Sequence, residues 1–425
     1  MNKNEQELQI IGQGTYGCVF RPNIECSKKD RTDPDFLSKI QQKDRTMINE
    51  INIGKKLPKS PRFAGILKTC PVTVGKIGKD GVSKCKMLQN KQSVNLVSNK
   101  IQYAGKDTIS KYLQNILSSN KSSEKQSEDY IKAIINAHVF LLQSLVVLNT
   151  SNVLHLDIKY NNIMIRDNKP VVIDFGLSFE KDKLNIDKYK TRSSLQPFGI
   201  AVDYYVPWCF EVILLSHVSR YMSVVDKDGN IKILIDKEKE GTVLNSKEEE
   251  ILIRVLNKYI ENNNVISMSI FTAQEKASFK EKMLLWIKEL KGKTWRDIWN
   301  KIISSSNTWD NYGLAVMFLI ELDLSGLLQI TDSQTEGFLR AYVNEIKQTI
   351  LSTPNERKLP EDTNKSLTAI FSRIKKIEHR DRVAKFSLLL KDKGNREKMI
   401  RNRVIAETDS VQKTELLKKQ MLKKN

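Results

Sequence analysis

The sequence predicts an α+β fold with two lobes: a small one built on an antiparallel sheet with one helix, and a larger, mainly helical one. Short segments rich in β-branched and apolar residues, separated by turn signals, fill most of the N-terminal quarter of the chain. After about residue 105, apolar residues recur at intervals of three or four, as on the buried face of a helix. A chain of 425 residues is long enough to give each lobe its own core.

The first element is a glycine-rich turn between two strands. Gly12, Gly14 and Gly17 follow the spacing GxGxxG, which can open either a dinucleotide-binding unit or a loop that covers nucleotide phosphates. A dinucleotide-binding unit needs a helix from the third glycine, whereas here a strand continues through Val19, and Pro22 then interrupts any helix. We therefore expect a β-hairpin over nucleotide phosphates. The residues expected to contact the nucleotide there are Ile11, Gly12, Gln13, Gly14, Thr15, Tyr16, Gly17 and Val19.

Three further strands and a helix complete the predicted small lobe. The strands are expected at residues 36–40, 65–74 and 93–103, and the helix at residues 45–57. The strand-rich pattern ends near Ala104, so the small lobe is expected to end there.

The helical part begins with a long helix that leads into a polar loop. From residue 130 to residue 149, isoleucine, leucine and valine recur at three- and four-residue spacing, which predicts a buried helix face. The loop that follows is residues 155–162, HLDIKYNN, and it supplies a carboxylate at Asp157, a lysine at Lys159 and an amide at Asn162.

A second carboxylate follows at the end of a predicted strand. Asp174 comes directly after the β-branched run Val171-Val172-Ile173, twelve residues beyond Asn162. Phosphoryl transfer needs a base for a hydroxyl, a cation for the moving phosphate and oxygen ligands for magnesium, and these residues supply all of them. The alternative is a surface loop that merely contains these residue types.

The loop and Asp174-Phe175-Gly176 match the catalytic loop and the DFG motif of eukaryotic-type protein kinases. The chain resembles serine/threonine protein kinases from Ile10 to Leu322, and Lys159 matches the serine/threonine rather than the tyrosine type. The stretch from Gly14 to Pro22 is similar to the diverged kinases of large cytoplasmic DNA viruses. The resemblance implies a bilobal protein kinase fold, ATP and Mg²⁺ as cofactors, and protein substrates. It also implies roles for four residues: Asp157 and Lys159 as catalytic groups, Asn162 and Asp174 as metal ligands.

The resemblance further implies an ion pair in the small lobe and a nucleotide-binding segment after it. The family pattern V-A-I-K is missing, and Lys39 with Glu50 as its partner is the best-placed substitute, against the alternative of a solvated surface lysine. The segment around Tyr103 is expected to receive the adenine edge through its backbone, and Asp107 to reach a ribose hydroxyl.

Three features of the large lobe follow from the same resemblance. Asp310 is expected to hold the backbone of the catalytic loop, or else to cap the helix that begins there. Glu211 is expected to anchor an ion pair in a diverged APE motif. Leu156 replaces the arginine that usually receives an activation-loop phosphate, so constitutive activity or control by another route is expected. The weakened regulatory candidates are Thr191, Ser193 and Ser194.

The predicted organisation is a kinase N-lobe at residues 1–104, a C-lobe at 105–350 with an insertion at about 212–305, and a basic helical extension at 351–425. The net charge is +20, and the last 53 residues hold 17 Lys and Arg against 7 Asp and Glu. This tail could bind nucleic acid or an anionic membrane, or it could be a solvated face. Its end is expected to fray or be disordered.

The cysteine content and the N-terminal residues indicate the cellular compartment of the protein. The five cysteines are odd in number, widely spaced and form no CxxC pair, so reduced thiols are expected rather than a disulfide framework or a zinc site. The N-terminus lacks the apolar segment of a secretory signal, and no apolar run reaches the roughly 18 residues of a membrane span. An intracellular protein without a transmembrane segment is expected, in the host cytoplasm or the virion if the chain is viral.

The sequence therefore favours an ATP-dependent serine/threonine protein kinase. Two other functions stay open at this point: a pseudokinase-like scaffold, in which the tail and the insertion bind partners, and a small-molecule phosphotransferase, whose catalytic loop also has the form HxDxxxxN.

Overall fold

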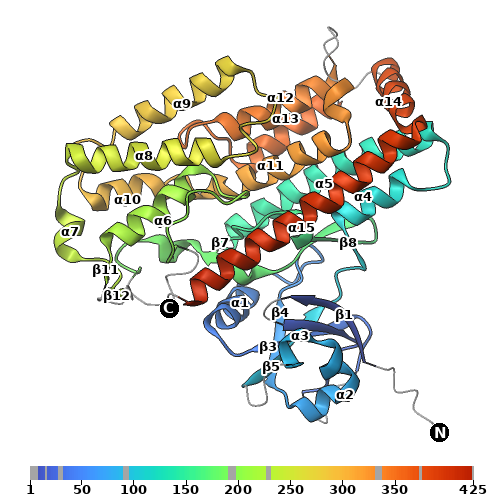
Figure 1. Cartoon of the computed structure of the whole chain (residues 1–425), viewed down its shortest axis with the longest axis horizontal. Helices are drawn as coiled ribbons and strands as arrows, with labels where there is room; N and C mark the ends of the chain where they lie inside the picture. The colour runs from blue at the N-terminus through green and yellow to red at the C-terminus, as the bar shows by residue number, and fades with distance from the viewer. Residues whose placement is uncertain are drawn as a thin grey trace. The chain divides into compact units, whose positions relative to one another are not determined.

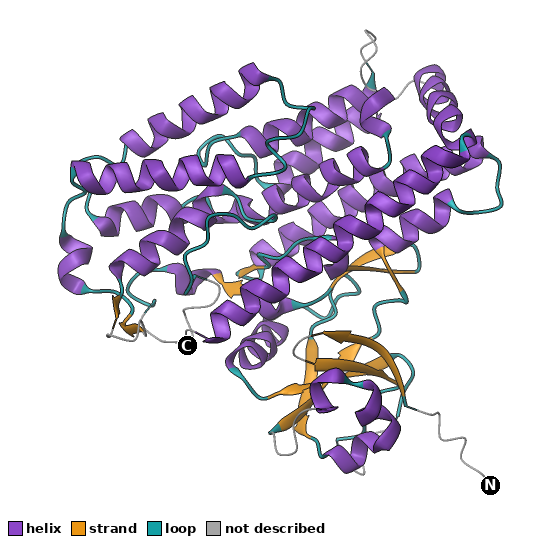
Figure 2. Cartoon of the chain, in the orientation of Figure 1, coloured by secondary structure: helices purple, strands orange, loops and turns teal. Residues whose placement is uncertain are grey.

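The computed structural model describes residues 8–14, 17–26, 32–89, 95–189, 198–225, 231–330, 337–372 and 376–423. The chain divides into two compact units. The first joins residues 1–106 to residues 164–178, and the second holds residues 107–163 and 179–425. Strands and short helices make up the first unit, whereas the second is mainly helical (Figures 1 and 2).

The core of the first unit is a five-stranded antiparallel sheet with strand order β1-β2-β3-β5-β4. Its register places Val19 opposite both Gly12 and Lys39, so the glycine hairpin is paired directly with the strand that carries the lysine. The strands lie where the sequence predicted them. Their bounds are β1 (Gln9–Gly14), β2 (Gly17–Arg21), β3 (Phe36–Gln42), β4 (Ile66–Pro71) and β5 (Leu96–Gln102).

The first unit contains more helix than predicted. Helix α1 (Arg45–Lys56) begins at Asp44, whose side chain accepts a hydrogen bond from the Met47 backbone N–H, as an N-cap does. Helices α2 (Val74–Lys84) and α3 (Lys86–Gln89) were not expected, so the prediction of a single helix is wrong. Gly75, Gly78 and Gly81 hid α2, because glycine is a poor helix former and this helix is kinked at Gly78.

Two disulfides tie the first unit together. Cys18 on β2 is bonded to Cys85, and Cys26 is bonded to Cys70 on β4. The expectation of reduced thiols is therefore wrong in this structure, so the cysteines no longer support the intracellular location, which stays a prediction. No local pattern indicates these bonds, because the bonded cysteines are 67 and 44 residues apart and only the fold brings them together.

Residues 164–178 belong to the first unit rather than to the helical one. They include most of β8 (Ile163–Arg166), all of β9 (Lys169–Val172) and the short helix η2 (Phe175–Leu177). Val172 exchanges backbone hydrogen bonds with its neighbours there: its carbonyl accepts from Ala64 N–H at 3.0 Å, and its N–H donates to the Arg62 carbonyl at 2.8 Å. A division at residue 104 alone therefore misses this return of the chain.

The second unit is built around helix α5 (Ser123–Thr150), which packs against α4, α11, α13 and α14. Among the described residues, α5 is the one helix long and apolar enough to cross a membrane by length and composition. Half of its most apolar stretch is buried inside the protein, which is typical of a core helix.

The remaining elements of the second unit complete this helical body (Figure 1). Its described strands are β6 (Asp107–Thr108), β7 (Val153–Leu154), β10 (Phe179–Glu180), β11 (Val224–Val225) and β12 (Ile231–Ile233). Its described α-helices besides α5 are α4 (Ile109–Leu117), α6 (Phe210–Met222), α7 (Lys237–Gly241), α8 (Ser246–Asn262), α9 (Ala273–Lys288), α10 (Trp295–Ile303), α11 (Trp309–Leu324), α12 (Phe338–Leu351), α13 (Pro360–Ser372), α14 (Lys376–Lys391) and α15 (Lys393–Lys423).

The segment predicted as an insertion is a folded part of the second unit. Helix α8 packs against α6 and α9, and α10 packs against α6 and α7. Trp286, Trp295 and Trp299 are all buried, so these helices share a core with α6 rather than forming a loose loop.

The C-terminal extension is helical to Lys423, where fraying or disorder was expected. Helix α15 packs against α4, α11, α14 and the short helix η1 (Tyr160–Asn162). Its Arg403 is buried and forms an ion pair with Glu321 of α11 and a hydrogen bond with the Tyr130 hydroxyl. This pairing fixes a helix whose sequence is too polar to predict as part of a core.

Candidate active site

In the first unit, the structure brings Lys39 and Glu50 together. The Lys39 Nζ lies 2.8 Å from both carboxylate oxygens of Glu50, which is buried on α1. Strand β3 supplies the lysine and the next element supplies the carboxylate, so a separation of eleven residues suffices. A lysine held in this way presents a fixed cation to an anionic group. The alternative of a solvated surface lysine is not what the geometry shows.

Asp174 lies beside this ion pair. Its Oδ1 is 3.8 Å from the Lys39 Nζ and accepts a hydrogen bond from the Gly176 N–H. The Asp174 backbone has a φ of 59°, in the left-handed region that non-glycine residues rarely adopt. Such strain is typical of functional sites, and here it directs the carboxylate toward the lysine.

The glycine hairpin adopts the predicted β1–β2 geometry, with Gly14 opposite Gly17. Gly17 is required sterically, because a Cβ there would lie 2.4 Å from the Ile40 carbonyl oxygen of β3. The side chain of Ile11 is 47% exposed, an apolar surface that a nucleotide could cover. Thr15 and Tyr16, which were also predicted to contact the nucleotide, lie outside the described residues.

The backbone of Tyr103 does not suit the predicted role at the adenine edge. Its N–H donates to the Asp35 carbonyl at 2.8 Å, and its carbonyl accepts from Arg166 at 3.0 Å. Both groups are therefore used inside the first unit. Asp107, the proposed ribose ligand, belongs to the second unit, where its carboxylate accepts a hydrogen bond from Asn115 at 3.3 Å.

In the second unit, the catalytic-loop residues form one hydrogen-bonded group. The Lys159 Nζ lies 2.9 Å from Asp157 Oδ1. The Asn162 amide donates to both the backbone carbonyl and the Oδ2 of Asp157, at 2.8 Å each. All three side chains are buried or nearly so. The carboxylate is thus oriented by a cation on one oxygen and an amide on the other.

Asp310 holds the backbone of this loop through two hydrogen bonds. Its two carboxylate oxygens accept hydrogen bonds of 2.7 Å from the backbone N–H groups of His155 and Leu156. Burial raises the pKa of the Asp310 carboxyl, although His155 and the two N–H groups lower it. The N-cap of α11 is Thr308, so the capping alternative for Asp310 is wrong.

His155 and Leu156 are structural. His155 is fully buried, and its Nδ1 accepts a hydrogen bond from the Asp157 N–H at 3.3 Å. Leu156 is buried with a φ of 60°, and its carbonyl accepts from the Trp208 indole at 2.8 Å. The residue that replaces the usual phosphate-sensing arginine is therefore part of the core. Thr191, Ser193 and Ser194 lie outside the described residues.

Glu211 forms a bidentate ion pair with Arg357, at 2.6 and 3.1 Å, and both side chains are buried. Burial alone lowers the pKa of the Arg357 guanidinium, but the adjacent Glu211 carboxylate raises that pKa above its ordinary value. The sequence predicted Glu211 as an anchor but did not identify its partner, which is 146 residues away.

Two residues that the sequence reasoning missed complete the surroundings of Asp157. The Tyr205 hydroxyl donates to Asp157 Oδ1 at 2.5 Å. The Thr414 hydroxyl of α15 is hydrogen-bonded to the same tyrosine hydroxyl at 2.8 Å and to the Lys159 Nζ. Tyr205 stands two residues before Pro207 of the diverged APE motif, a usable signal. Thr414 lies in a polar tail 255 residues from Lys159, and no local pattern identifies it.

The donor set suits magnesium. Magnesium is usually held by one or two carboxylates together with substrate phosphates. With its amide nitrogen bound to Asp157, Asn162 retains Oδ1 as a ligand atom, and Asp174 supplies a carboxylate. Within the described ranges, no group of three or more His, Cys, Asp or Glu side chains forms a metal cluster. Asn162 in the second unit and Asp174 in the first would each offer such an ion one oxygen ligand, and nucleotide phosphates would supply others.

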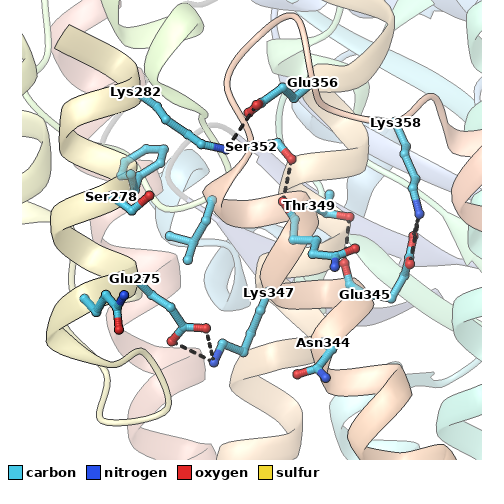
Figure 3. A pocket seen from close by; sticks show the side chains of 14 residues that line it. Glu275, Ser278, Lys282, Asn344, Glu345, Lys347, Thr349, Ser352, Glu356 and Lys358 are labelled. Atoms are coloured by element: carbon cyan, nitrogen blue, oxygen red, sulfur yellow. Dashed lines mark hydrogen bonds and ion pairs between the residues drawn. The ribbon is translucent and has the colours of Figure 1, made fainter. Parts of the chain in front are cut away.

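A polar cavity of about 700 Å³ lies elsewhere in the second unit, lined mainly by α9 and α12. Figure 3 shows that its charged side chains pair with one another. Lys347 pairs with Glu275 at 2.7 Å and Lys282 with Glu356 at 3.0 Å. The charges of these four side chains are therefore already paired with one another.

Comparison with known proteins agrees with this geometry. Residues 6–195 match the family model described as "Protein kinase domain", and the stretch includes Lys39, Asp157 and Asp174. A segment of 102 residues is 31% identical to "EKC/KEOPS complex subunit BUD32" from Yarrowia lipolytica. This match covers 23% of the chain and 38% of that relative. The comparisons support a protein-kinase-like family, and the antiparallel sheet followed by a mostly helical remainder is consistent with a bilobal kinase fold.

Proposed function

We propose that this chain is an ATP- and magnesium-dependent protein kinase that transfers the γ-phosphoryl group to serine or threonine hydroxyls. The observation that supports it most is the arrangement of Asp157, whose carboxylate is held by Lys159 and Asn162 on a loop fixed by Asp310. In a surface loop that contained these residue types by chance, the three side chains would not be expected to be hydrogen-bonded to one another.

In this proposal the residues divide the work. Asp157 orients the acceptor hydroxyl and receives its proton. Lys159 neutralises charge on the moving phosphoryl group, and Lys39, fixed by Glu50, does so on the nucleotide. Asn162 and Asp174 would each supply an oxygen ligand to magnesium, which would offset the phosphate charge. The protein's contribution is then positioning and electrostatics.

A kinase assay with casein or myelin basic protein tests the proposal. Asp157→Asn and Asp174→Ala should each lower phosphate incorporation by at least about 10²-fold, since each removes a group that touches the reacting phosphate or its metal. Asp167→Asn is the matched control, because Asp167 is an exposed carboxylate in the turn between β8 and β9. Equal incorporation by all four proteins would refute the proposal.

The other functions are separated by two further measurements. A pseudokinase scaffold would not change its thermal unfolding midpoint in Mg-ATP, or would bind the nucleotide without transfer. A small-molecule phosphotransferase would modify a panel of sugars, amines and small alcohols in preference to proteins. The similar protein from Yarrowia lipolytica is named as a subunit of the EKC/KEOPS complex, and a similar partnership for this chain would appear as co-purifying subunits.

The remaining sequence predictions stay predictions. They are the serine/threonine preference, the similarity to viral kinases, the intracellular location and an anionic partner for the basic tail. The tail itself is folded onto the second unit through Arg403, so a nucleic acid or membrane would meet a helix rather than a free segment.

A further inference from the structure

Helix α15 places a threonine hydroxyl on the catalytic loop. Thr414 is buried, and its hydroxyl is hydrogen-bonded to the Lys159 Nζ and, at 2.8 Å, to the Tyr205 hydroxyl. That tyrosine hydroxyl donates to Asp157 Oδ1 at 2.5 Å. Thr414 therefore touches the lysine proposed to neutralise the moving phosphoryl group, and one hydroxyl separates it from the proposed base. All four residues belong to the second unit.

Specific side-chain contacts hold helix α15 in this position. Arg403, two to three turns earlier, is buried in its ion pair with Glu321. The Asn161 amide of the catalytic loop donates to the Glu407 carbonyl of α15 at 3.4 Å. A cavity of about 370 Å³ runs between α15 and the loop, with Lys159 and Ser410 among its lining residues. The space beside the loop is thus partly open, whereas the Thr414 side chain is buried.

We propose that Thr414 is a phosphorylation site that this chain modifies itself, within one molecule. The inference rests on the proposed kinase function. In the step, the Thr414 Oγ forms a bond to the γ-phosphorus of ATP, and the bond from that phosphorus to the β–γ bridging oxygen breaks. ADP leaves with the electron pair. The threonine proton passes to the Tyr205 hydroxyl as that hydroxyl gives its own proton to Asp157.

Phosphorylation of Thr414 is expected to change how helix α15 packs on the catalytic loop. Phosphothreonine carries close to two negative charges at neutral pH and three added oxygens. In the unmodified state the Thr414 side chain is buried and the Asp157 carboxylate lies one hydroxyl away. A phosphate added there would place its charge in a buried position beside the like charge of Asp157, with Lys159 as the nearby cation. We expect this end of α15 to leave the loop, which opens the loop to other acceptors.

The test uses the full chain, first treated with a phosphatase that is then removed. On incubation with Mg-ATP, mass spectrometry should locate phosphate on Thr414. The rate constant should be independent of protein concentration, since the reaction is intramolecular. Thr408 is the matched control: it lies on the same helix, its hydroxyl also bonds a backbone carbonyl four residues earlier, and its side chain is exposed. It should stay unmodified.

The consequence is measured with an external acceptor. Prior incubation with Mg-ATP should raise the initial rate on myelin basic protein about tenfold, equal to ~1.4 kcal/mol. Prior incubation should not change the rate of Thr414→Val, which keeps the shape of the side chain without the hydroxyl. Thr408→Val should respond as the wild type does. Thermal unfolding midpoints of both variants within a few degrees of wild type show that they fold.

Each other outcome overturns the inference. Asp157-dependent transfer to myelin basic protein without phosphate on Thr414 would refute this inference and leave the proposed function standing. No transfer to either acceptor would refute both. Equal phosphate on Thr408 and Thr414, or transfer from wild type to a full-length Asp157→Asn chain, would refute the intramolecular placement.

Discussion

The Arg357 guanidinium and the Glu211 carboxylate meet face to face inside the second unit, at 2.6 and 3.1 Å. Arg357 follows helix α12 and Glu211 lies in the first turn of α6, so the pair joins segments far apart in the chain. A buried charge whose partner is removed is strongly destabilising, because it is left without solvent or a counter-ion.

Arg357→Met should therefore lower the free energy of unfolding by about 3–5 kcal/mol, measured by urea denaturation. Lys365→Met is the control, because Lys365 pairs with Asp362 at 3.2 Å on the exposed surface of α13. That variant should stay within about 0.5 kcal/mol of wild type. Equal losses for both variants would contradict the argument from burial.

Asp310 is a positioning residue, so its removal should lower turnover more than nucleotide affinity. Asparagine keeps the shape but accepts one of the two backbone hydrogen bonds and turns an amide against the other N–H. Asp310→Asn should lower kcat about 10²-fold with little change in KM for ATP, since a displaced loop misplaces Asp157. Asp323→Asn, an exposed position on the same helix, should leave both constants unchanged.

Local patterns were enough to predict the parts of the site that are close in sequence. The strand of Lys39, the helix of Glu50 and the loop around Asp157 all lie where periodicity and turn signals placed them. Each depends on residues within a few turns of one another, so side-chain spacing carries the information.

What the sequence could not predict depends on long-range packing. Helix α2 was missed because its glycines disfavour helix, yet Gly81 lies where a Cβ would be 3.1 Å from the Phe20 ring. The partners of Glu211 and Lys159 are 146 and 255 residues away. Helix α15 looked like a solvated tail because buried Arg403 is a charged residue, and its ion pair is visible only in the fold.

Lys39→Met separates a catalytic lysine from a structural one. If the cation held by Glu50 acts on the nucleotide, the variant should lose about 10²-fold in kinase activity at temperatures well below its thermal unfolding midpoint. That midpoint should itself fall, because the buried Glu50 carboxylate is left unpaired. Lys68→Met, on strand β4 of the same sheet, is the control and should retain activity. Full activity of the Lys39 variant would show that the ion pair with Glu50 is structural only.

The two disulfides can be tested by counting the free thiols of the protein. Denatured protein alkylated without reductant should incorporate one label among its five cysteines, at Cys209, because the other four are paired. Replacing Cys18 and Cys85 by serine should cost the first unit about 4 kcal/mol, given a closed loop of 67 residues. Five labels on freshly isolated protein would favour the reduced state that the composition predicted.

His138 should make the second unit sensitive to mild acid. Its ring stacks on Phe318 at 4.1 Å, and its Nδ1 lies 2.8 Å from the Tyr342 hydroxyl. Burial lowers the pKa of His138 to about 3 from an ordinary value of 6.5. Because the unfolded chain binds the proton more readily, stability is intact above about pH 6.5 and falls as the pH drops toward 3, by about 1.4 kcal/mol per pH unit.

Urea denaturation at pH 7 and pH 5 measures this loss. His138→Gln should show a slope flatter than wild type by about 1.4 kcal/mol per pH unit below pH 6.5, since carboxylates elsewhere titrate equally in both proteins. Tyr342→Phe leaves the buried imidazole in place and should keep the wild-type slope. Parallel slopes for wild type and His138→Gln would show that His138 takes up a proton without unfolding, so that its surroundings, and not its burial, set its charge.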